Sequence, residues 1–331
     1  MKYLIVDIAN QLSTNSYVRV QEPEMIPIAA ITLTVNNIVK LFNQYKCDHV
    51  VIACEGGSWR KIVYPEYKAN RQVKKLLQTE KEKEQSKYFF QETDKFIKFL
   101  QEKTNTTVLQ ASGIEGDDFV ARWIQVHPDD EHIILSNDGD FIQLLVNDNV
   151  SIYNTSGKYL LSNEYAINDE GTLAYTEKVV EEIVSGVKTK IKKSFPIKVP
   201  NPEYELFKKC IRGDSGDNIR SAYPKCFEKS TKNKVGIIDA FEDRNNKGIQ
   251  WNMFMLTEWK KTIGRTDDGE PIIKNVKVID EYEKNVELID LSKQPQEIKD
   301  LMDSVIEKEK EKSRKFSIGF DFVKICNEIG L

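Results

Sequence analysis

The sequence predicts an α/β fold, in which a twisted, mostly parallel sheet flanked by helices is followed by a mainly helical C-terminal domain. Over the first half of the 331-residue chain, short apolar runs alternate with stretches of helical pattern. This order of elements is typical of parallel sheets. After about residue 165 the strand pattern fades and apolar residues recur at helical spacing. We therefore expect a sheet-based domain over 1–165 and a mainly helical domain over 166–331.

Five segments have the pattern of buried parallel strands, which are near-continuous apolar runs. These are 2–8 (KYLIVDI), 49–54 (HVVIAC), 106–110 (TTVLQ), 131–135 (EHIIL) and 149–154 (NVSIYN). Residues 29–45, between the first two, have apolar positions at helical spacing. In such sheets ligands bind beyond the carboxyl ends of the strands. Asp7, Glu55 and Asp138 fall at such ends, which makes this edge the expected site.

Three other segments have patterns that differ from those of the buried strands. The highly charged stretch 72–100 favours a helix, and its apolar stripe is weak until Phe89. The basic, proline-punctuated stretch 187–200 is expected to be a loop or a small excursion, whereas PIIKNVKVI within 264–285 has some strand character.

The composition is that of a soluble globular protein, with 40% apolar and 30% charged residues. The net charge of −4 argues against a protein coated in basic residues, but acids gathered in one pocket can mask basic patches elsewhere. The five cysteines form no CxxC pair and are odd in number, which predicts reduced thiols in a cytoplasmic protein and no zinc site. The N-terminus MKYLIVDIAN is too short for a signal peptide. We also expect no membrane span, because no apolar run approaches the roughly 20 residues required.

Acidic residues are concentrated in the segment 111–145. Glu115, Asp117 and Asp118 form one group, and Asp138 and Asp140 form another on the far side of a predicted strand. Carboxylates at that density repel one another unless a cation lies among them. Oxygen-rich sites of this kind suit Mg²⁺ or Mn²⁺.

Each acidic group also has a purely structural interpretation. Ser112 and Glu115 fit a capping box, and acids in a first helical turn favour the helix dipole. The motif SNDGD fits a turn after a strand, with Asp140 capping the next helix. Because Asp7 and Glu55 end strands of the same sheet, a metal site explains the combination better than capping does.

Basic and aromatic residues interleave in SWRKIVYPEYKANR at 58–71, directly after the second strand. This mixture suits phosphate contacts combined with base stacking. Lys68 and Arg71 are three apart and would share one face of a helix. An ordinary amphipathic surface is the alternative.

The motif GDSGDNI at 213–219 places Asp214 and Asp217 in a turn between helices. Simple turn chemistry is the alternative to a functional role. Lysines follow, in a spread that suits contact with duplex phosphates or, equally, a solvated face. They are Lys225, Lys229, Lys232 and Lys234.

These motifs occur in the order found in a known family. The strand-ending Asp7, then YPEYKANR, EGDD, SNDGD and GDSGDNI, resemble the 5′ nucleases of the flap-endonuclease superfamily. The spacing is most similar to the RNase H-type 5′ nucleases of T-even-like bacteriophages. The resemblance is anchored from residue 2 to about 219. It implies a PIN-like nuclease core, a helical arch over about 66–100 and a helix-hairpin-helix-like duplex-binding region over about 203–245.

The resemblance implies a two-metal-ion phosphodiesterase that uses Mg²⁺, with Mn²⁺ as a substitute. The ligands implied for the first ion are Asp7, Glu55, Glu115 and Asp118. Those implied for the second ion are Asp117, Asp138, Asp140, Asp214 and Asp217. The catalytic pair implied is Lys68 and Arg71, which would stabilise charge on the scissile phosphate. The nucleic-acid-binding residues expected are Arg60, Lys61, Tyr67, Lys74, Lys75, Lys225, Lys229, Lys232 and Lys234.

The implied activity is that of a 5′-3′ exonuclease and 5′-flap endonuclease. It would act on DNA, and on RNA primers annealed to DNA, during lagging-strand maturation in phage DNA replication. The expected partners are 5′-flap or forked DNA and RNA–DNA hybrids, with a single-stranded DNA-binding protein or a sliding clamp as candidate protein partners. We expect a monomer in the bacterial host cytoplasm, with no membrane contact.

Two departures from the family pattern leave alternatives open. The second strand is followed by Glu55 where the family usually has aspartate, and the segment 220–225 (RSAYPK) lacks the glycines of the usual hairpin. A catalytically degenerate protein that binds forked DNA is one alternative. A PIN-like ribonuclease that cuts single strands is another, disfavoured by the 213–219 motif and the arch-like segment.

Overall fold

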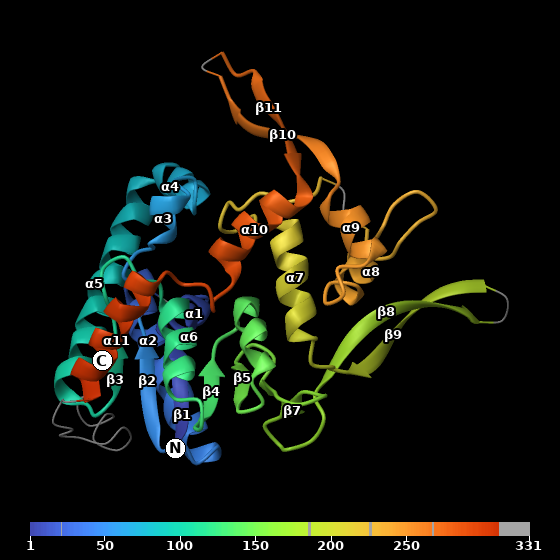
Figure 1. Cartoon of the computed structure of the whole chain (residues 1–331). Helices are drawn as coiled ribbons and strands as arrows, with labels where there is room; N and C mark the ends of the chain where they lie inside the picture. Colours follow the sequence, from blue (N-terminus) through green and yellow to red (C-terminus); the bar gives the residue numbers. More distant parts are fainter. Residues whose placement is uncertain (21, 185–186, 225–226, 267, 311–331) are drawn as a thin grey trace. The chain divides into compact units, whose positions relative to one another are not determined.

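The chain folds into two compact units, each built from separate stretches of sequence, as seen in a computed structural model (Figure 1). The structure describes residues 1–20, 22–184, 187–224, 227–266 and 268–310. The first unit contains Met1–Gly57, Glu80–Pro200 and the residues from Glu297 onward. The second contains Ser58–Thr79 and Asn201–Gln296. We describe each unit by itself, and the domain boundary expected at residue 165 stays a prediction.

A seven-stranded sheet forms the centre of the first unit, in the order β3-β2-β1-β4-β5-β6-β7. Its strands are β1 (Lys2–Asp7), β2 (His49–Ala53), β3 (Thr107–Leu109), β4 (Glu131–Leu135), β5 (Val150–Asn154), β6 (Tyr159–Leu161) and β7 (Ile167–Asn168). Strands β1 to β5 pair in parallel, whereas β6 and β7 are antiparallel. All five predicted strands are present, and the predicted fold class is confirmed.

The register brings the ends of three strands together. Asp7 lies opposite Ala53 of β2, and Val6 lies opposite Leu135 of β4. Because these neighbouring strands run in parallel, their carboxyl ends share one edge of the sheet. The residues that follow β1, β2 and β4 therefore all begin at this edge of the sheet.

Helices cover this sheet and supply most of the core. They are α1 (Ile8–Asn15), η1 (Pro23–Met25), α2 (Ile26–Gln44), α5 (Glu80–Lys103), α6 (Gly116–Val126), η2 (Gly139–Val146) and α11 (Gln296–Lys310). The long helix α5 buries Phe96, Ile97, Phe99 and Leu100 near its C-terminal end. Its charged first half buries none of its side chains, as the weak apolar stripe predicted.

One helical stretch within the described residues, Pro23–Gln44, is apolar and long enough to cross a membrane by length and composition, with a mean hydropathy of 1.6. The expectation that no apolar run reaches such a length therefore missed it. One face of α2 is buried in the core of the first unit, through residues such as Ala30, Ile31, Ile38 and Leu41. A core helix passes the same test as a membrane span, so the finding is weak evidence for one.

The stretch 187–200, expected to be a loop or a small excursion, contains the second strand of a β-ribbon. Strands β8 (Tyr175–Val184) and β9 (Val187–Pro196) pair in an antiparallel manner over ten residues each. The sequence pattern did not predict this ribbon. Its described side chains are mostly exposed on both faces, so its strands lack the apolar alternation that predicts a β-strand.

The second unit is mainly helical, as expected for the C-terminal part of the chain. Its elements are α3 (Arg60–Val63), α4 (Ala69–Leu76), α7 (Pro202–Arg212), α8 (Ile237–Glu242), α9 (Ile249–Met255), β10 (Glu258–Arg265), β11 (Pro271–Lys277) and α10 (Val278–Ile289). Aromatic residues dominate its core, with Phe207, Phe241 and Phe254 packed together. The strand character noted in PIIKNVKVI corresponds to β11, which pairs with β10.

Candidate metal-dependent active site

Three carboxylates converge at the start of helix α6. One ligand oxygen from each of Glu115, Asp117 and Asp118 lies within 4.8 Å of the other two. Glu115 is the N-cap residue of α6, yet its side chain makes no capping hydrogen bond. The capping-box interpretation with Ser112 is therefore wrong, because the helix begins three residues later than that interpretation requires.

The fit of this group to a divalent cation follows from its chemistry and burial. Glu115 is 2% exposed and Asp118 is fully buried, so neither charge is well solvated. Burying neighbouring carboxylates is costly unless a positive charge compensates them. Three carboxylate groups form a hard donor set, which suits Mg²⁺ or Mn²⁺. Within the described part of the chain, this is the group of acids, histidines and cysteines that meets the geometry of a metal site.

The loop that carries Glu55 is locked against the segment that leads into this group. The Gly56 amide donates to the Ile114 carbonyl at 2.8 Å, and the Gly113 amide donates to the Gly56 carbonyl at 2.7 Å. A Cβ atom at Gly56 would lie 1.8 Å from the carbonyl oxygen of Ala111, so glycine is required there. Glu55 itself is exposed at the end of β2. The backbone therefore fixes where Glu55 lies relative to the loop before Glu115.

The start of α6 also packs against the end of β2. A Cβ atom on Gly116 would lie 3.5 Å from the Ala53 carbonyl oxygen, which is ordinary van der Waals contact. Ala53 is in turn the register partner of Asp7. The buried acids of α6 and the end of β1 are thus both adjacent to the last residue of β2.

Asp7 is linked by hydrogen bonds to the turn after β4. Its carboxylate accepts from the Asn10 amide at 3.1 Å and from the Ser136 hydroxyl at 2.9 Å. The same hydroxyl accepts from the Asp138 amide at 3.0 Å. Ser136 is a positioning residue that sequence reasoning missed. No sequence pattern marks it, because its contact with Asp7 depends on the parallel register of β1 with β4.

The capping role in SNDGD belongs to Asp138 rather than to Asp140. The Asp138 carboxylate accepts from the Asp140 amide at 2.9 Å and caps the 3-10 helix η2. Asp138 is exposed and Asp140 is half-buried. Both residues follow the strand next to β1, and their coordination of an ion stays a prediction.

A cysteine beside these acids keeps its proton. Burial, followed by the nearby carboxylates of Glu55 and Asp7, raises the pKa of the Cys54 thiol to about 12. A neutral thiol is a poor metal ligand. The acids that converge at the start of α6 offer carboxylate oxygens as ligands.

In the second unit the predicted basic pair meets Asp217. Arg71 Nη2 lies 2.6 Å from Asp217 Oδ1, and Lys68 Nζ lies 3.8 Å from Oδ2. The Tyr67 hydroxyl donates to Oδ2 at 2.9 Å, and the Lys68 amide donates to the Asp217 carbonyl at 2.9 Å. Asp217 therefore acts as the anchor of the Lys68/Arg71 pair.

Two residues expected to contact nucleic acid are buried in this unit. Tyr67 is 2% exposed and packs with Cys210, Ile219 and Leu288, which leaves no open ring face for a base. Arg60 is 1% exposed, and its Nε donates to the Leu288 carbonyl at 2.7 Å. The structure thus differs from the expectation for both side chains, because each holds the unit together.

Asp214 belongs to an ion pair in the same unit. Its carboxylate lies 2.7 Å from Lys209 Nζ and accepts from the Gly216 amide at 2.7 Å. Burial alone would raise the pKa of Asp214, but the Lys209 ammonium and the backbone amides outweigh it and lower the pKa. Asp214 is therefore ionised at neutral pH.

The other basic residues expected to contact nucleic acid lie at the surface of the second unit. The exposed ones are Lys61, Lys74, Lys75, Lys229, Lys232 and Lys234. Lys234 Nζ lies 5.7 Å from the centre of the Tyr223 ring, a distance typical of a cation–π contact. Lys225 lies outside the described residues. Phosphate contacts by these lysines stay predictions.

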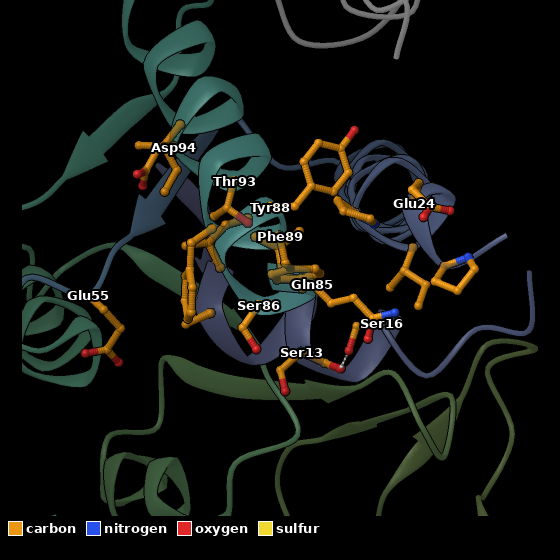
Figure 2. Close-up of a pocket in the computed structure, with 18 of the residues that line it drawn as sticks. Ser13, Ser16, Glu24, Glu55, Gln85, Ser86, Tyr88, Phe89, Thr93 and Asp94 are labelled. Carbon is orange, nitrogen blue, oxygen red and sulfur yellow. Dashed lines mark hydrogen bonds between the residues drawn. The ribbon is translucent and has the colours of Figure 1, made fainter. Parts of the chain in front are cut away.

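A cavity of about 780 Å³ in the first unit has Glu55 in its wall (Figure 2). Tyr88 and Phe89 of α5 line it together with Ser13 of α1 and Glu24 of η1. The lining is mainly apolar and aromatic, with hydroxyl and carboxyl groups at intervals. A space of this size and character accommodates a planar organic group next to the acidic edge of the sheet.

Comparison with known proteins decides the family. Residues 2–183 match the family of 5′-3′ exonuclease N-terminal resolvase-like domains, which is more than half of the chain. The chain belongs to this family. The matched segment contains Asp7, Glu55, the acids of α6 and the SNDGD turn. The predicted resemblance to the 5′-3′ exonuclease and flap-endonuclease superfamily is confirmed.

The relatives are nucleases of bacteriophage T5. The flap endonuclease of Escherichia phage T5 is 28% identical over 192 residues, which are 56% of this chain and 55% of that protein. The chain thus spans about half the length of this curated relative. A crystal structure of a T5 D15 flap endonuclease variant with DNA and metal ions aligns with 94% of this chain and 100% of that one, with a TM-score of 0.59 and 18% identity. The zinc-bound T5 5′-exonuclease aligns with 93% of this chain and 99% of that one, with a TM-score of 0.57 and 18% identity. These structural similarities establish the fold.

Proposed function

We propose that this protein is a metal-dependent 5′ nuclease that hydrolyses phosphodiester bonds at free 5′ ends and at 5′ flaps. The observation that carries the proposal is the convergence of Glu115, Asp117 and Asp118 beside the carboxyl ends of β1 and β2. The family supports it, because the matched domain is that of 5′-3′ exonucleases. A buried carboxylate group at this edge of a parallel sheet is a binding site for a cation and, through it, for a phosphate.

Glu115, Asp117 and Asp118 would hold one divalent ion, for which we propose Mg²⁺ with Mn²⁺ as a substitute. Asp117, which the family resemblance assigns to the second ion, is proposed for the first because its carboxylate lies with those of Glu115 and Asp118. Asp7 and Glu55 are proposed to complete that site, and Asp138 and Asp140 to serve a second ion. Such an ion, when bound, stabilises charge on a phosphoryl oxygen and lowers the pKa of its bound water. The protein orients these acids through backbone contacts before any substrate arrives.

The role proposed for the basic pair is to bind the scissile phosphate. Lys68 and Arg71 supply donors that stabilise the charge developing on the phosphate oxygens. Asp217 keeps the charged side chains of Lys68 and Arg71 oriented. Coordination of an ion by Asp214 and Asp217 is also proposed from the family resemblance, although here Asp214 pairs with Lys209.

The substrate proposed is 5′-flap or forked DNA, together with RNA primers annealed to DNA during lagging-strand maturation in phage replication. We propose that the protein acts as a monomer in the host cytoplasm, with a single-stranded DNA-binding protein or a sliding clamp as protein partner. The C-terminal segment 316–331, whose apolar pattern favours packing against its own domain over docking of a protein partner, lies outside the described residues.

The cavity beside Glu55 is proposed to receive a base of the unpaired 5′ strand. Tyr88 and Phe89 offer aromatic surface for stacking, which is worth roughly 1–3 kcal/mol per base in single-strand binders. The lining holds the acids Glu24, Glu55, Glu84 and Asp94 and the cation Lys81, so its net negative charge favours an uncharged base over the phosphate backbone. The variant Tyr88→Ala is expected to weaken flap binding about tenfold, whereas Tyr88→Phe should not, and equal losses in both would rule out stacking.

The test of the nuclease proposal is cleavage of a 5′-labelled flap. Wild-type protein should cut it in Mg²⁺ and in Mn²⁺ and not in EDTA, whereas the double variant Asp138→Ala/Asp140→Ala should lose activity. Full activity in the double variant would exclude a role for the SNDGD acids. Tight flap binding without product in either metal would favour the alternative of a degenerate DNA-binding protein. Comparison of free RNA with RNA annealed to DNA separates the proposed enzyme from a single-strand ribonuclease.

A further inference from the structure

The β8–β9 ribbon is an arm with a fixed base and exposed faces. Backbone hydrogen bonds join its base to the segment 164–174, including the Ala166 amide to the Ile197 carbonyl at 2.9 Å and the Ile197 amide to the Ala174 carbonyl at 2.8 Å. Figure 1 shows the two strands extending away from β7. Among the described side chains of the ribbon, Val179 is 62% exposed and Tyr175 is 57% exposed. A two-stranded ribbon without a covering layer is only marginally stable on its own, which suggests that a ligand covers it.

Lysines occupy one face of β9 at every second residue. Lys188, Lys190 and Lys192 alternate along the strand, so their side chains leave the same face and span about 13 Å. Lys192 pairs with Glu177 at 3.3 Å, but both side chains are highly exposed, so this bond is weak. The described contacts include no ion pair for Lys188 or Lys190. From 187 to 198 the chain carries five lysines and no acid, although the protein as a whole is acidic.

We propose that this lysine face of the β8–β9 ribbon binds the phosphate backbone of duplex DNA. The proposal rests on the nuclease function proposed above, because a flap substrate always includes a duplex. A two-stranded ribbon fits the major groove of B-DNA, and a row of cations along one strand complements the phosphates at its border. Charge complementarity favours DNA over an acidic protein segment, because the phosphates of a duplex repeat regularly over the length of the row.

Protection of a sheet edge is the alternative explanation for these lysines. Exposed edge strands commonly carry lysine to prevent pairing with another chain. Edge protection needs charge of either sign on any face, whereas DNA binding needs a continuous row of cations. Glu177 and Glu181 of β8 lie on the lysine face, with Glu181 directly opposite Lys190, so β9 alone forms the row of cations. Lys178, Lys193 and Glu182 lie on the opposite face. The arm therefore supplies its own controls.

The experiment measures binding of the full-length protein to a fluorescent blunt duplex, in EDTA, over a series of salt concentrations. The variant Lys188→Gln/Lys190→Gln should bind about fivefold to tenfold more weakly, with a slope of log affinity against log salt that is smaller by about two. The matched control Lys178→Gln/Lys193→Gln removes the same charge from the opposite face and should change affinity less than about twofold. Glu181→Gln should tighten binding, because it removes an acid from the lysine face.

Equal effects of the two double variants, or no effect of either, would overturn the proposal. Aggregation of Lys188→Gln/Lys190→Gln with unchanged DNA affinity would assign the lysines to edge protection. Thermal unfolding checks that both variants are folded, which is expected because the four side chains are exposed. Flap cleavage at saturating substrate distinguishes failure of the proposed nuclease function from failure of DNA binding by the ribbon. Wild-type protein that binds duplex with the expected slope but cuts nothing contradicts the nuclease function alone, whereas normal cleavage with unchanged slopes contradicts the arm alone.

Discussion

Substitution of Asp118 by asparagine tests whether the acids of α6 are arranged for a cation. The change removes one charge and keeps the side-chain shape. Ligand oxygens of Glu115, Asp117 and Asp118 lie within 4.8 Å of one another. At that separation, two charges repel by about 3.5 kcal/mol with an effective dielectric constant of about 20. Relaxation and solvent screening reduce this energy, so Asp118→Asn should raise the free energy of unfolding in EDTA by about 1–3 kcal/mol.

Metal should reverse the order of stability. A ligand that binds only the folded state stabilises it by about 4.1 kcal/mol when its concentration is about one thousand times Kd. Wild-type protein should gain this energy in MgCl₂, and Asp118→Asn should gain little. Each kcal/mol shifts Tm by about 2–4 °C in a unit of this size, so the crossing is measurable by thermal unfolding followed by circular dichroism.

The matched control is Asp148→Asn, an exposed acid outside the group, which should behave like wild type in both conditions. Flap cleavage by Asp118→Asn should fall at least about 100-fold. A variant that is less stable than wild type in EDTA, and that Mg²⁺ still stabilises fully, would refute the assignment of Asp118 as a ligand.

Three further predictions concern the parts that position the site. Gly56→Ala should destabilise the first unit by more than about 2 kcal/mol and abolish cleavage, because its Cβ would collide with the Ala111 carbonyl. The control Gly139→Ala has open space around its Cβ, so it should retain wild-type stability in unfolding assays and wild-type activity in cleavage assays. Arg71→Ala should lower kcat by about 100-fold to 1,000-fold and leave Mg²⁺-induced stabilisation unchanged; loss of that stabilisation would contradict a role confined to the phosphate. The folded-state pKa of Asp214 is lowered, so its contribution to stability is present above its unfolded-state pKa and is lost as pH falls through the folded value. Stability should therefore decline below about pH 4 in wild type and less steeply in Lys209→Ala, as measured by denaturant unfolding at each pH.

The core of the first unit could be predicted because its strands are buried on both faces. Segments such as 2–8 and 49–54 are continuous apolar runs, and that pattern identifies a parallel strand without knowledge of its partners. The acids at the strand ends could also be predicted, because they come directly after the apolar runs in the sequence. The motif EGDD predicted a group of acids, and Glu115, Asp117 and Asp118 do converge at the start of α6, although the helix starts at Gly116.

The features that the sequence did not reveal depend on contacts with other residues, either on a neighbouring strand or far along the chain. The β8–β9 ribbon has charged side chains on both faces, so its strands are recognisable only through their cross-strand pairs. Tyr67 and Arg60 have the composition of a nucleic-acid surface, but Leu288 and its neighbours from the far end of the second unit bury them. Ser136 carries no distinctive pattern, and its role depends on the parallel register of β1 with β4.

The two halves of the proposed chemistry are held in different ways. Backbone groups fix the carboxylates, since Asp7 accepts from the Asn10 amide and Asp138 from the Asp140 amide. The basic pair lies at the start of α4, which buries none of its residues, and Arg71 is 59% exposed. Charged contacts with Asp217 hold the pair, and such contacts exchange readily when another anion arrives. A phosphate can therefore replace Asp217 as the partner of Arg71, so the fold positions the carboxylates, whereas the proposed phosphate contacts form with the substrate.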